Sequence, residues 1–414
     1  MKRMFVSLMF VLATVVLSTT ITFANDEYGE KLIKELQTIR EDKYATGFTD
    51  ILVDPAIVLI ARAYADSVVS DNMSANPIAT AQVIASLSEL GNGTTERDLL
   101  NLLKIDPFKL RTVNYLKFEE KLKSKLGSEN YKTFSVMLLK SPYSFRKDIP
   151  EIFKKKYGLQ TYASDLSEEN ITELNQKIKT ISGFKNVVSY SPNNILLSVS
   201  ASDTIGIWPN EMTYRRGKFL GQTVPAIIGK INSYNTVHLN KRYKGYKFEL
   251  KNSNAYFFLV DDKDQLKKLA FHIADKGVLV SPLDDTKKGP INLVIPEIDS
   301  QKSEINYKEF ALKNGHYNPF ITTADYSKGI VGGTDVYCSD LKTFADLQIS
   351  EMGIRLKQVT YAALGSKGLG PKIEKLPEIK IDRPFLLLLA DKEYGCCFTM
   401  AFVSELPKQD EESE

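Results

Sequence analysis

The chain has 414 residues, of which 43% are hydrophobic and 25% charged, so its composition is that of an ordinary globular protein. The formal net charge of +3 gives no general argument for nucleic-acid binding, and we expect no nucleic-acid partner. Three cysteines are too few for a disulfide-rich scaffold, and their spacing fits no zinc site.

The first 24 residues have the pattern of a secretory signal peptide. Lys2 and Arg3 precede an apolar run, and Thr22-Phe23-Ala24 fits a cleavage site. The alternative is an uncleaved membrane anchor, since the run could just span a bilayer. No later segment is long and apolar enough to span one. We therefore expect residues 1–24 to be removed, which leaves a secreted, extracellular chain with a formal charge of +1.

Helices are predicted in the N-terminal half. Apolar residues recur at helical spacing between residues 54 and 69. The next helix has Asn76 as its cap and Gly91 as its stop, and another opens at Thr95. A further helix is predicted over residues 167–183, where leucines and isoleucines share one side and a glycine follows.

Three asparagines stand in the pattern that accepts N-linked sugar. Asn72 lies next to an apolar run, so we expect it to be inaccessible. Asn92 lies in the turn between two predicted helices and is the best candidate. Asn170 is the second residue that we expect to be glycosylated.

Strands are predicted in the second half of the chain, as apolar runs bounded by Pro, Gly, Asn and Asp. The last two flank a turn at residues 391–395 and are expected to pair as a hairpin. No linker divides helices from strands, so we predict one α+β domain, followed by a frayed acidic tail at residues 409–414. The runs are NILLSVSA, NAYFFLV, PINLVIPEI, PFLLLLA and CCFTMAFV.

Cys396 and Cys397 fall within the last of these strands, and we interpret them as small buried residues. A single bridge to Cys338 is the alternative.

Catalytic signatures are absent from the sequence. The three histidines lie in unrelated contexts, and neither a His-Glu-x-x-His pattern nor a Gly-x-Ser-x-Gly elbow occurs. Residues 365–370 are rich in glycine but lack the Gly-Lys-Ser/Thr ending of a phosphate loop. A triad of distant residues stays open as an alternative. We expect the protein not to be an enzyme and to need no cofactor or metal.

Several segments occur along the chain in a fixed order: NPIATAQVIASLSELGNGTTERDLLNLL, VSASDTIGIW, Thr223-Val224-Pro225, LVIPEI, Phe320 with Ala324-Asp325-Tyr326-Ser327, and PEIKIDRPFLLLLADKEYGCCFTMAFVSELP. In their order and spacing, these segments resemble the serpin family. The resemblance covers about residues 55–407, and it is closest in the terminal hairpin, with Pro384-Phe385 and Gly395. It implies the serpin fold, a single α+β domain with a large central β-sheet, further sheets and a helical N-terminal half.

Four positions depart from the family pattern and indicate a diverged member. Ser200 stands where the family usually has Asn, and Met212 stands where it usually has Phe. Ala401-Phe402 replaces the usual Gly-Arg. With the resemblance, residues 25–408 are assigned to the serpin domain, and residues 351–383 within them to the reactive-loop region.

The resemblance implies that this loop is the exposed bait that serpins present to a protease. The protease cleaves the loop and is held as an acyl-enzyme. The freed loop then enters the main sheet as a new strand. Inhibitory members favour small residues in the loop's hinge. Here Glu351 and Gly353 match the start of the hinge, and Ile354 and Leu356 do not.

Two interpretations of this hinge compete. In the first, the bulky residues at 354 and 356–359 slow insertion, so a protease cuts the loop and leaves. In the second, Ile354 and Leu356 face the core of the sheet while Arg355 and Lys357 face water, as in an amphipathic strand. In that case Gln358 points inward and needs a hydrogen-bonding partner.

The length of the loop bears on the same question. Counting forward from Gly353 at inhibitory spacing puts the scissile bond at Lys367-Gly368, and counting back from Pro384 puts it at Ile373-Glu374. The loop is therefore six residues longer than the usual pattern, and slack weakens the tether that traps an acyl-enzyme.

Two functional hypotheses follow. In the first, the protein is a secreted, monomeric serpin with weak inhibition or none, acting as protease-cleavable bait or as a binding protein for another secreted protein. In the second, it is a suicide inhibitor of an extracellular trypsin-like serine protease. Lys367 or Lys372 would then be the specificity residue.

Overall fold

The helices predicted in the N-terminal half are present in the computed structural model, which describes residues 49–67, 72–283, 288–358 and 376–407. Asn76 caps α4, because its side chain accepts hydrogen bonds from the backbone N–H groups of Ile78 and Ala79. Ser167 caps α9 in the same way. The α-helices are α3 Asp54–Asp66, α4 Pro77–Leu90, α5 Thr94–Leu102, α6 Pro107–Leu110, α7 Tyr115–Leu126, α8 Ile149–Ile152, α9 Glu168–Ser182, α10 Lys263–Lys276 and α11 Tyr307–Lys313, with short π-helical turns η1 Thr49–Val53 and η2 Phe153–Tyr157 and 3₁₀ turns η3 Asn318–Phe320 and η4 Gly333–Asp335.

Gly91 ends α4 for a different reason from the predicted one. Its φ is −73°, so it does not adopt the left-handed conformation of a typical helix stop. A Cβ atom at this position would lie 2.9 Å from the backbone nitrogen of Glu96. Glycine is therefore required here because α4 and α5 approach each other closely.

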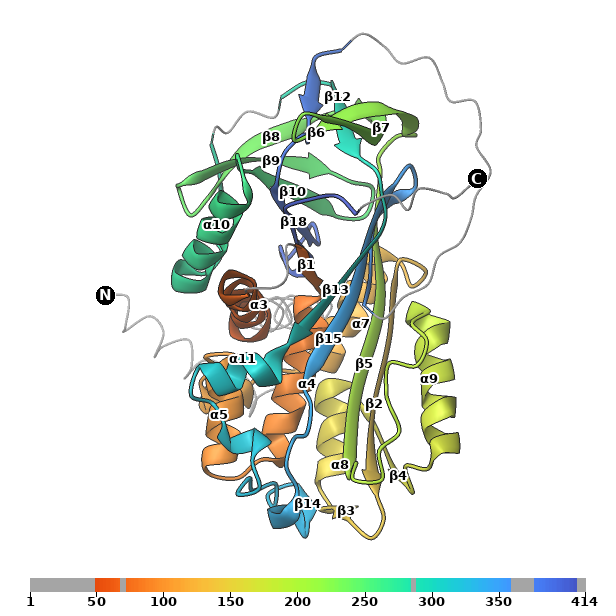
Figure 1. Ribbon diagram of the computed structural model, residues 1–414, viewed down its shortest axis with the longest axis vertical. Helices are drawn as coiled ribbons and strands as arrows, with labels where there is room; N and C mark the ends of the chain where they lie inside the picture. The colour runs from red at the N-terminus through yellow and green to blue at the C-terminus, as the bar shows by residue number, and fades with distance from the viewer. Residues whose placement is uncertain (1–48, 68–71, 284–287, 359–375, 408–414) are drawn as a thin grey trace, which may run out of the picture. The chain divides into compact units, whose positions relative to one another are not determined.

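The five predicted strand runs are all extended, and the last two pair antiparallel as β18 and β19. Figure 1 shows β13, β15, β5 and β2 lying side by side along one sheet, with α9 beside β5 and β2. The strands are β1 Asn72–Ala75, β2 Tyr131–Lys140, β3 Ser144–Phe145, β4 Gln160–Ser164, β5 Leu196–Ile207, β6 Thr213–Phe219, β7 Gln222–Ile231, β8 Tyr234–Leu239, β9 Tyr243–Glu249, β10 Asn254–Leu259, β11 Val280–Pro282, β12 Ile291–Pro296, β13 Ile298–Asn306, β14 Ile330–Val331, β15 Lys342–Ser350, β16 Gly353–Gln358, β17 Glu378–Lys380, β18 Phe385–Ala390 and β19 Cys397–Val403.

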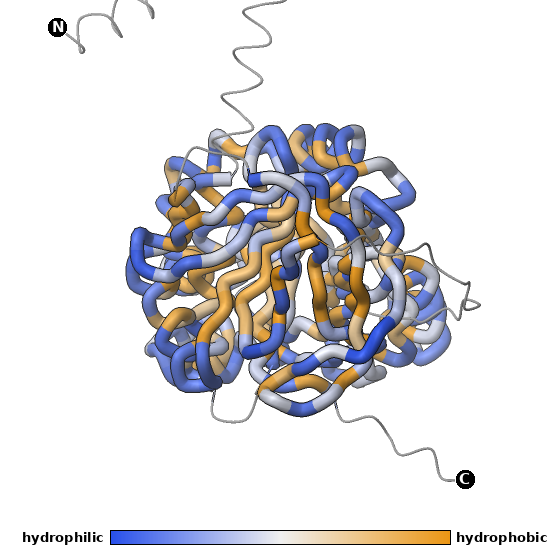
Figure 2. Tube along the Cα trace, turned by 90° about the horizontal axis from the view of Figure 1, so that it is seen from above, coloured by the Kyte–Doolittle hydropathy of each residue, from blue (hydrophilic) through white to orange (hydrophobic). Residues whose placement is uncertain are grey.

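These strands form four sheets. The six-stranded sheet has the order β13-β15-β16-β5-β2-β4, and the seven-stranded sheet has the order β1-β19-β18-β10-β9-β8-β11. A four-stranded sheet, β17-β12-β7-β6, and a two-stranded sheet, β14-β3, complete the set. Apolar strand segments lie in the interior and polar segments lie outside them (Figure 2). The α+β prediction is therefore confirmed.

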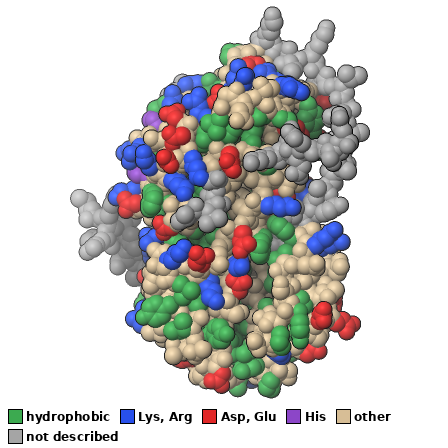
Figure 3. All heavy atoms as spheres, viewed as in Figure 1, with side chains coloured by type: hydrophobic (Ala, Val, Ile, Leu, Met, Phe, Trp, Pro, Cys, Tyr) green, Lys and Arg blue, Asp and Glu red, His purple; other side chains and the backbone are tan. Residues whose placement is uncertain are grey.

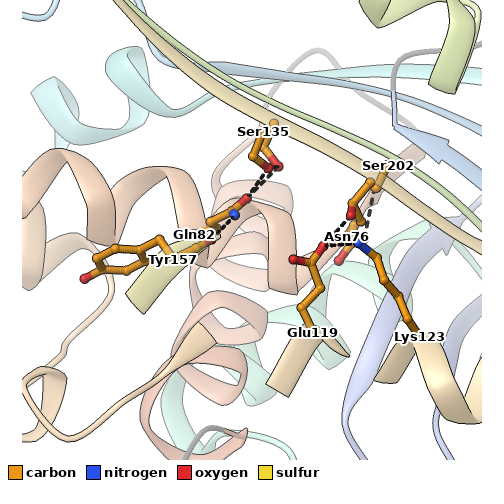
Figure 4. A network of polar contacts seen from close by, with 9 residues as sticks. Asn76, Gln82, Glu119, Lys123, Ser135, Tyr157 and Ser202 are labelled. Atoms are coloured by element: carbon orange, nitrogen blue, oxygen red, sulfur yellow. Dashed lines mark hydrogen bonds and ion pairs between the residues drawn. The ribbon is translucent and has the colours of Figure 1, made fainter. Parts of the chain in front are cut away.

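The two faces of the six-stranded sheet are covered differently. On one face, Leu174 and Ile178 of α9 pack against Val136 of β2, with Val199 of β5 beside them. On the other face, Gln82 of α4 accepts hydrogen bonds from serine hydroxyls of β2 and β5, each 2.8 Å long. The amide of Gln82 also donates to the carbonyl oxygen of Tyr157 (Figure 4). A polar layer, rather than a purely apolar one, thus connects α4 to the sheet.

All three cysteines are free thiols, so the alternative of a bridge to Cys338 is wrong. Cys396 and Cys397 are buried, as predicted. Burial raises the pKa of the Cys397 thiol to about 12 and that of the Cys396 thiol well above its ordinary value. Both are therefore uncharged, poorly reactive core residues at neutral pH.

Charged residues of both signs are interspersed on the face shown in Figure 3, in keeping with the near-neutral net charge. Across the described part of the chain, no helix has the length and apolar character needed to cross a membrane. The same residues contain no group of three or more His, Cys, Asp or Glu side chains arranged to hold a metal ion.

Asp54, in the first turn of α3, makes stability depend on pH. Burial, with a smaller contribution from Asp50, raises its pKa from 3.8 to about 6. The folded state therefore keeps this proton to a higher pH than the unfolded state, so stability is lost as pH rises from about 4 to about 6. We expect Asp54→Asn to raise the free energy of unfolding at pH 7 by up to about 3 kcal/mol, since one pKa unit corresponds to about 1.4 kcal/mol.

Urea unfolding of the unmodified protein and of the Asp54→Asn variant, at pH 4 and at pH 7, measures the difference in their free energies of unfolding. The gain should be much smaller at pH 4, where the aspartic acid is protonated in the folded state. An equal gain at both pH values would contradict it.

Candidate functional site

The strand β16 is the candidate functional site, because it contains the predicted hinge and lies inside the six-stranded sheet. It pairs antiparallel with β15 on one side and antiparallel with β5 on the other. Leu356, for example, lies opposite Leu347 of β15 and Thr204 of β5. The hinge residues from Gly353 to Gln358 thus have strand neighbours on both sides in the uncut chain.

A two-residue turn, Glu351-Met352, folds β16 directly back from β15. Side chains from elsewhere in the fold hold the start of this turn. The indole Nε1–H of Trp208 donates to the carbonyl oxygen of Ser350, 2.8 Å away. The hydroxyl of Tyr214 donates to the carboxylate of Glu351, and burial together with this carboxylate raises the pKa of Tyr214.

Gly353 is fixed by close packing at the start of β16. A Cβ atom on this residue would lie 2.4 Å from the carbonyl oxygen of Gly206 in β5. Any residue with a side chain at this position would push β16 and β5 apart. Glycine is therefore required where the hinge enters the sheet at this register.

The apolar hinge residues face the core. Ile354 and Leu356 are both 0% exposed. Their placement agrees with the second interpretation of the hinge, in which they are inward residues of an amphipathic strand. In this register they do not obstruct the sheet.

Gln358 has the partner that an inward polar residue needs. Its Oε1 accepts a hydrogen bond of 2.7 Å from the backbone N–H of Asn76. The side-chain amide of Asn76 donates in turn to the hydroxyl of Ser202 on β5, 3.0 Å away (Figure 4). Asn76 therefore connects the cap of α4, the strand β5 and the hinge. The sequence indicated its role as a cap but not its contact with the hinge.

The opposite face of β16 carries two cations. Arg355 donates to both carboxylate oxygens of Asp203, at 2.7 and 2.5 Å. This bidentate pair raises the pKa of Arg355 further above its ordinary value.

The prediction that Lys357 faces water is wrong, because its exposure is only 3%. Burial, with the nearby charge of Arg355, lowers the pKa of Lys357. The carboxylates of Asp203 and Asp346, directly across from it on the two neighbouring strands, favour its charged form. Sequence reasoning missed both aspartates, although an acidic residue within each of two strand-forming runs was a visible signal.

A family profile described as Serpin (serine protease inhibitor) matches residues 56–406. The chain belongs to the serpin family. Serpins are in general protease inhibitors rather than catalysts. No curated protein sequence matches the chain significantly.

Solved serpin structures share the fold at low sequence identity. The structure "Cleaved Serpin 42Da" superimposes with a TM-score of 0.68 at 15% identity, covering 88% of this chain and 99% of that one. Thyroxine-binding globulin in complex with thyroxine gives a TM-score of 0.67 at 17% identity, covering 87% of this chain and 100% of that one. Serpin48 of the insect Tenebrio molitor gives a TM-score of 0.64 at 18% identity, and the match covers 89% of this chain and 98% of that one. At this identity the similarity establishes the fold alone.

The predicted cleavage sites of this serpin lie outside the described residues, and the chain is described again from Leu376. There, β17 pairs in parallel with β12, and Arg215 donates to Glu378 at 3.0 Å. The sites concerned are Lys367, Gly368, Lys372, Ile373 and Glu374.

The two predicted glycosylation sites have different surroundings in this serpin. Asn92 is exposed, and its side-chain amide donates to the carboxylate of Asp325 at 3.0 Å. Asn170 is half-buried in the first turn of α9, and its amide donates to Asp165 at 2.5 Å. Each bond uses the nitrogen to which sugar would be attached. Both sites stay predictions.

Proposed function

We propose that this serpin is a secreted protein whose loop is protease-cleavable bait or a binding element for another secreted protein, and that it inhibits proteases weakly or not at all. The observation that carries the proposal is the position of β16 between β15 and β5 in the uncut chain. In this proposal the protein acts as a monomer outside the cell.

The argument rests on the source of the energy for suicide inhibition. That mechanism depends on stored energy, which is released when the cut loop enters the main sheet. Here the six residues Gly353–Gln358 already have strand partners on both sides before any cut. Less strand pairing remains to be gained after cleavage, so the force that would distort a bound protease is smaller.

The length of the loop supports the same conclusion. The family's inhibitory spacing, counted from either end, leaves six extra residues between β16 and the terminal hairpin. A longer tether lets the acyl-enzyme keep its active geometry for longer. Hydrolysis then competes well with trapping.

Incubation with a trypsin-like protease, followed by denaturing gel electrophoresis, tests the proposal. We expect cleavage within residues 365–375 with little protein in a covalent complex. Replacing Lys367, Lys372 and Lys375 with glutamine is the matched control, because it removes every lysine of this segment, and it should abolish this cut. A denaturant-resistant complex at near-stoichiometric yield would overturn the proposal.

One observation favours the alternative function, suicide inhibition of a trypsin-like serine protease with Lys367 or Lys372 as the specificity residue. Ile354 and Leu356 fit the sheet as inward residues and are fully buried. Bulk in the hinge is therefore no barrier to the inserted state itself. The two functions give opposite results on the gel described above.

Secretion and glycosylation give a separate prediction. We expect cleavage after Ala24 and sugar on Asn92 and Asn170 when the protein is made in a eukaryotic secretory pathway. Mass spectrometry of the mature protein before and after enzymatic deglycosylation checks this. An intact mass that includes Met1 and does not change on deglycosylation would contradict both parts.

A further inference from the structure

A row of alternating charges crosses the six-stranded sheet at the level of Lys357. The strand register places Lys302 of β13 opposite Asp346 of β15, and Asp346 opposite Lys357 of β16. Lys357 lies opposite Asp203 of β5, and Asp203 lies opposite Lys132 of β2. The signs thus alternate over five neighbouring strands, and we call these five residues the charge row. The hinge strand supplies the central cation.

The middle of the charge row is buried, whereas its two ends are exposed. Asp346, Lys357 and Asp203 are 0%, 3% and 5% exposed, while Lys302 and Lys132 lie at the surface. One carboxylate oxygen of Asp346 accepts a hydrogen bond from Ser300 at 2.8 Å, and the other has no hydrogen-bond partner among the described residues. A buried carboxylate in this state depends on nearby positive charge.

The two aspartates would face each other if β16 left the sheet. Since β15 and β5 are each antiparallel to β16, they run parallel to one another. Direct pairing of these two strands would place Asp346 and Asp203 on one face, across a single strand spacing of about 4.8 Å. Like charges directly opposite one another destabilise a sheet, and burial strengthens the repulsion. Arg355 and Lys357 would have gone with the hinge, so neither cation would remain to offset it.

We propose that the charge row is an electrostatic latch that keeps the hinge strand in the sheet of the uncut chain. Arg355 and Lys357 are the part of the latch that moves with the hinge, and Asp203 and Asp346 are the part that stays. The latch opposes closure of β15 onto β5, and so it favours the hinge-inserted state over the hinge-expelled state.

Amide hydrogen exchange tests the latch on the full chain. The variant Arg355→Gln with Lys357→Met removes both hinge cations at similar side-chain size. We expect the amides of residues 353–358 to exchange at least about tenfold faster than in the unmodified protein, because the strand leaves the sheet more often. Exchange in β18 should not change. Equal exchange rates in β16 of the two proteins would overturn the proposal.

A charge-matched control separates the latch from net charge. The variant Arg383→Gln with Lys392→Met also removes two cations, each from an exposed ion pair away from β16. It should leave exchange in β16 unchanged. Acceleration as large as that in the hinge variant would overturn the proposal.

A rescue variant separates charge from packing. Adding Asp203→Asn and Asp346→Asn to the hinge variant removes the two carboxylates that would repel each other. We expect exchange in β16 to slow to within about threefold of the unmodified protein. If the combined variant exchanges as fast as the hinge variant, the effect comes from lost packing and the latch is overturned.

A milder variant covers the case in which the hinge variant does not fold, as judged by far-UV circular dichroism. Arg355→Gln alone changes a side chain that is 35% exposed. It should still accelerate exchange in β16 by about threefold, and no change would overturn the latch. The latch can fail while the proposed function stands, because exchange reports on the strand whereas the gel reports on the protease.

Discussion

We expect the substitution Leu356→Ala to lower the free energy of unfolding by about 2–5 kcal/mol, the range measured for leucine truncation in a packed core. Leu356 is 0% exposed and lies between Leu347 of β15 and Thr204 of β5. Truncation would leave a cavity that strands paired on both sides cannot easily close. Urea unfolding, followed by circular dichroism, measures the loss.

Met352 provides the control for this prediction. It lies four residues earlier, in the turn before β16, and it is 67% exposed. Met352→Ala should change stability by less than about 0.5 kcal/mol, as most surface substitutions do. If Leu356→Ala were equally mild, the hinge would lie outside the sheet in solution, and the proposed function would lose its main support.

The second large effect is expected at Asn76. Asn76→Ala removes the cap of α4 and leaves the hydroxyl of Ser202 without its donor, while the backbone N–H still reaches Gln358. Losing a helix cap costs about 1 kcal/mol, and leaving buried polar groups unpaired adds about 1–3 kcal/mol. We therefore expect a loss of about 2–4 kcal/mol in the free energy of unfolding.

Asn306 is a matched control, because it caps α11 by accepting from the backbone N–H of Glu309 at 3.0 Å. Asn306→Ala removes a cap in a more exposed setting, and it should cost about 1 kcal/mol. The difference between the two alanine variants estimates what Asn76 contributes beyond its cap. Equal losses would mean that its link to β5 contributes nothing measurable.

Local signals were sufficient to predict several elements from the sequence. The cap at Asn76 and the helical spacing that follows it predicted α4, and Ser167 and Gly183 bracketed α9 in the same way. The terminal hairpin was predictable because two apolar runs flank a short turn. Each of these patterns lies within about twenty residues of sequence.

The hinge could not be placed by local signals. Its inward residues were predictable from their alternation, but the burial of Lys357 depends on partners that are distant in sequence, such as Asp203, 154 positions earlier. The strand β6 was not predicted either, because its sequence, TYRRGKF, mixes charged and aromatic residues on an open surface. Strand pairing is non-local, so sheet order and buried charge pairs cannot be inferred from a short window.

The order of strands in the six-stranded sheet also has a consequence for biosynthesis. A ribosome makes β2, β4 and β5 first and β13, β15 and β16 at least ninety residues later. These two groups occupy opposite sides of the sheet, and β16 is the seam between them. The strand β16 is the last strand of this sheet to be made. Its Gln358 pairs with Asn76, which was made 282 residues earlier. Until this strand is in place, we expect β5 to be an unpaired strand edge of the growing sheet, and such edges are prone to aggregation during folding.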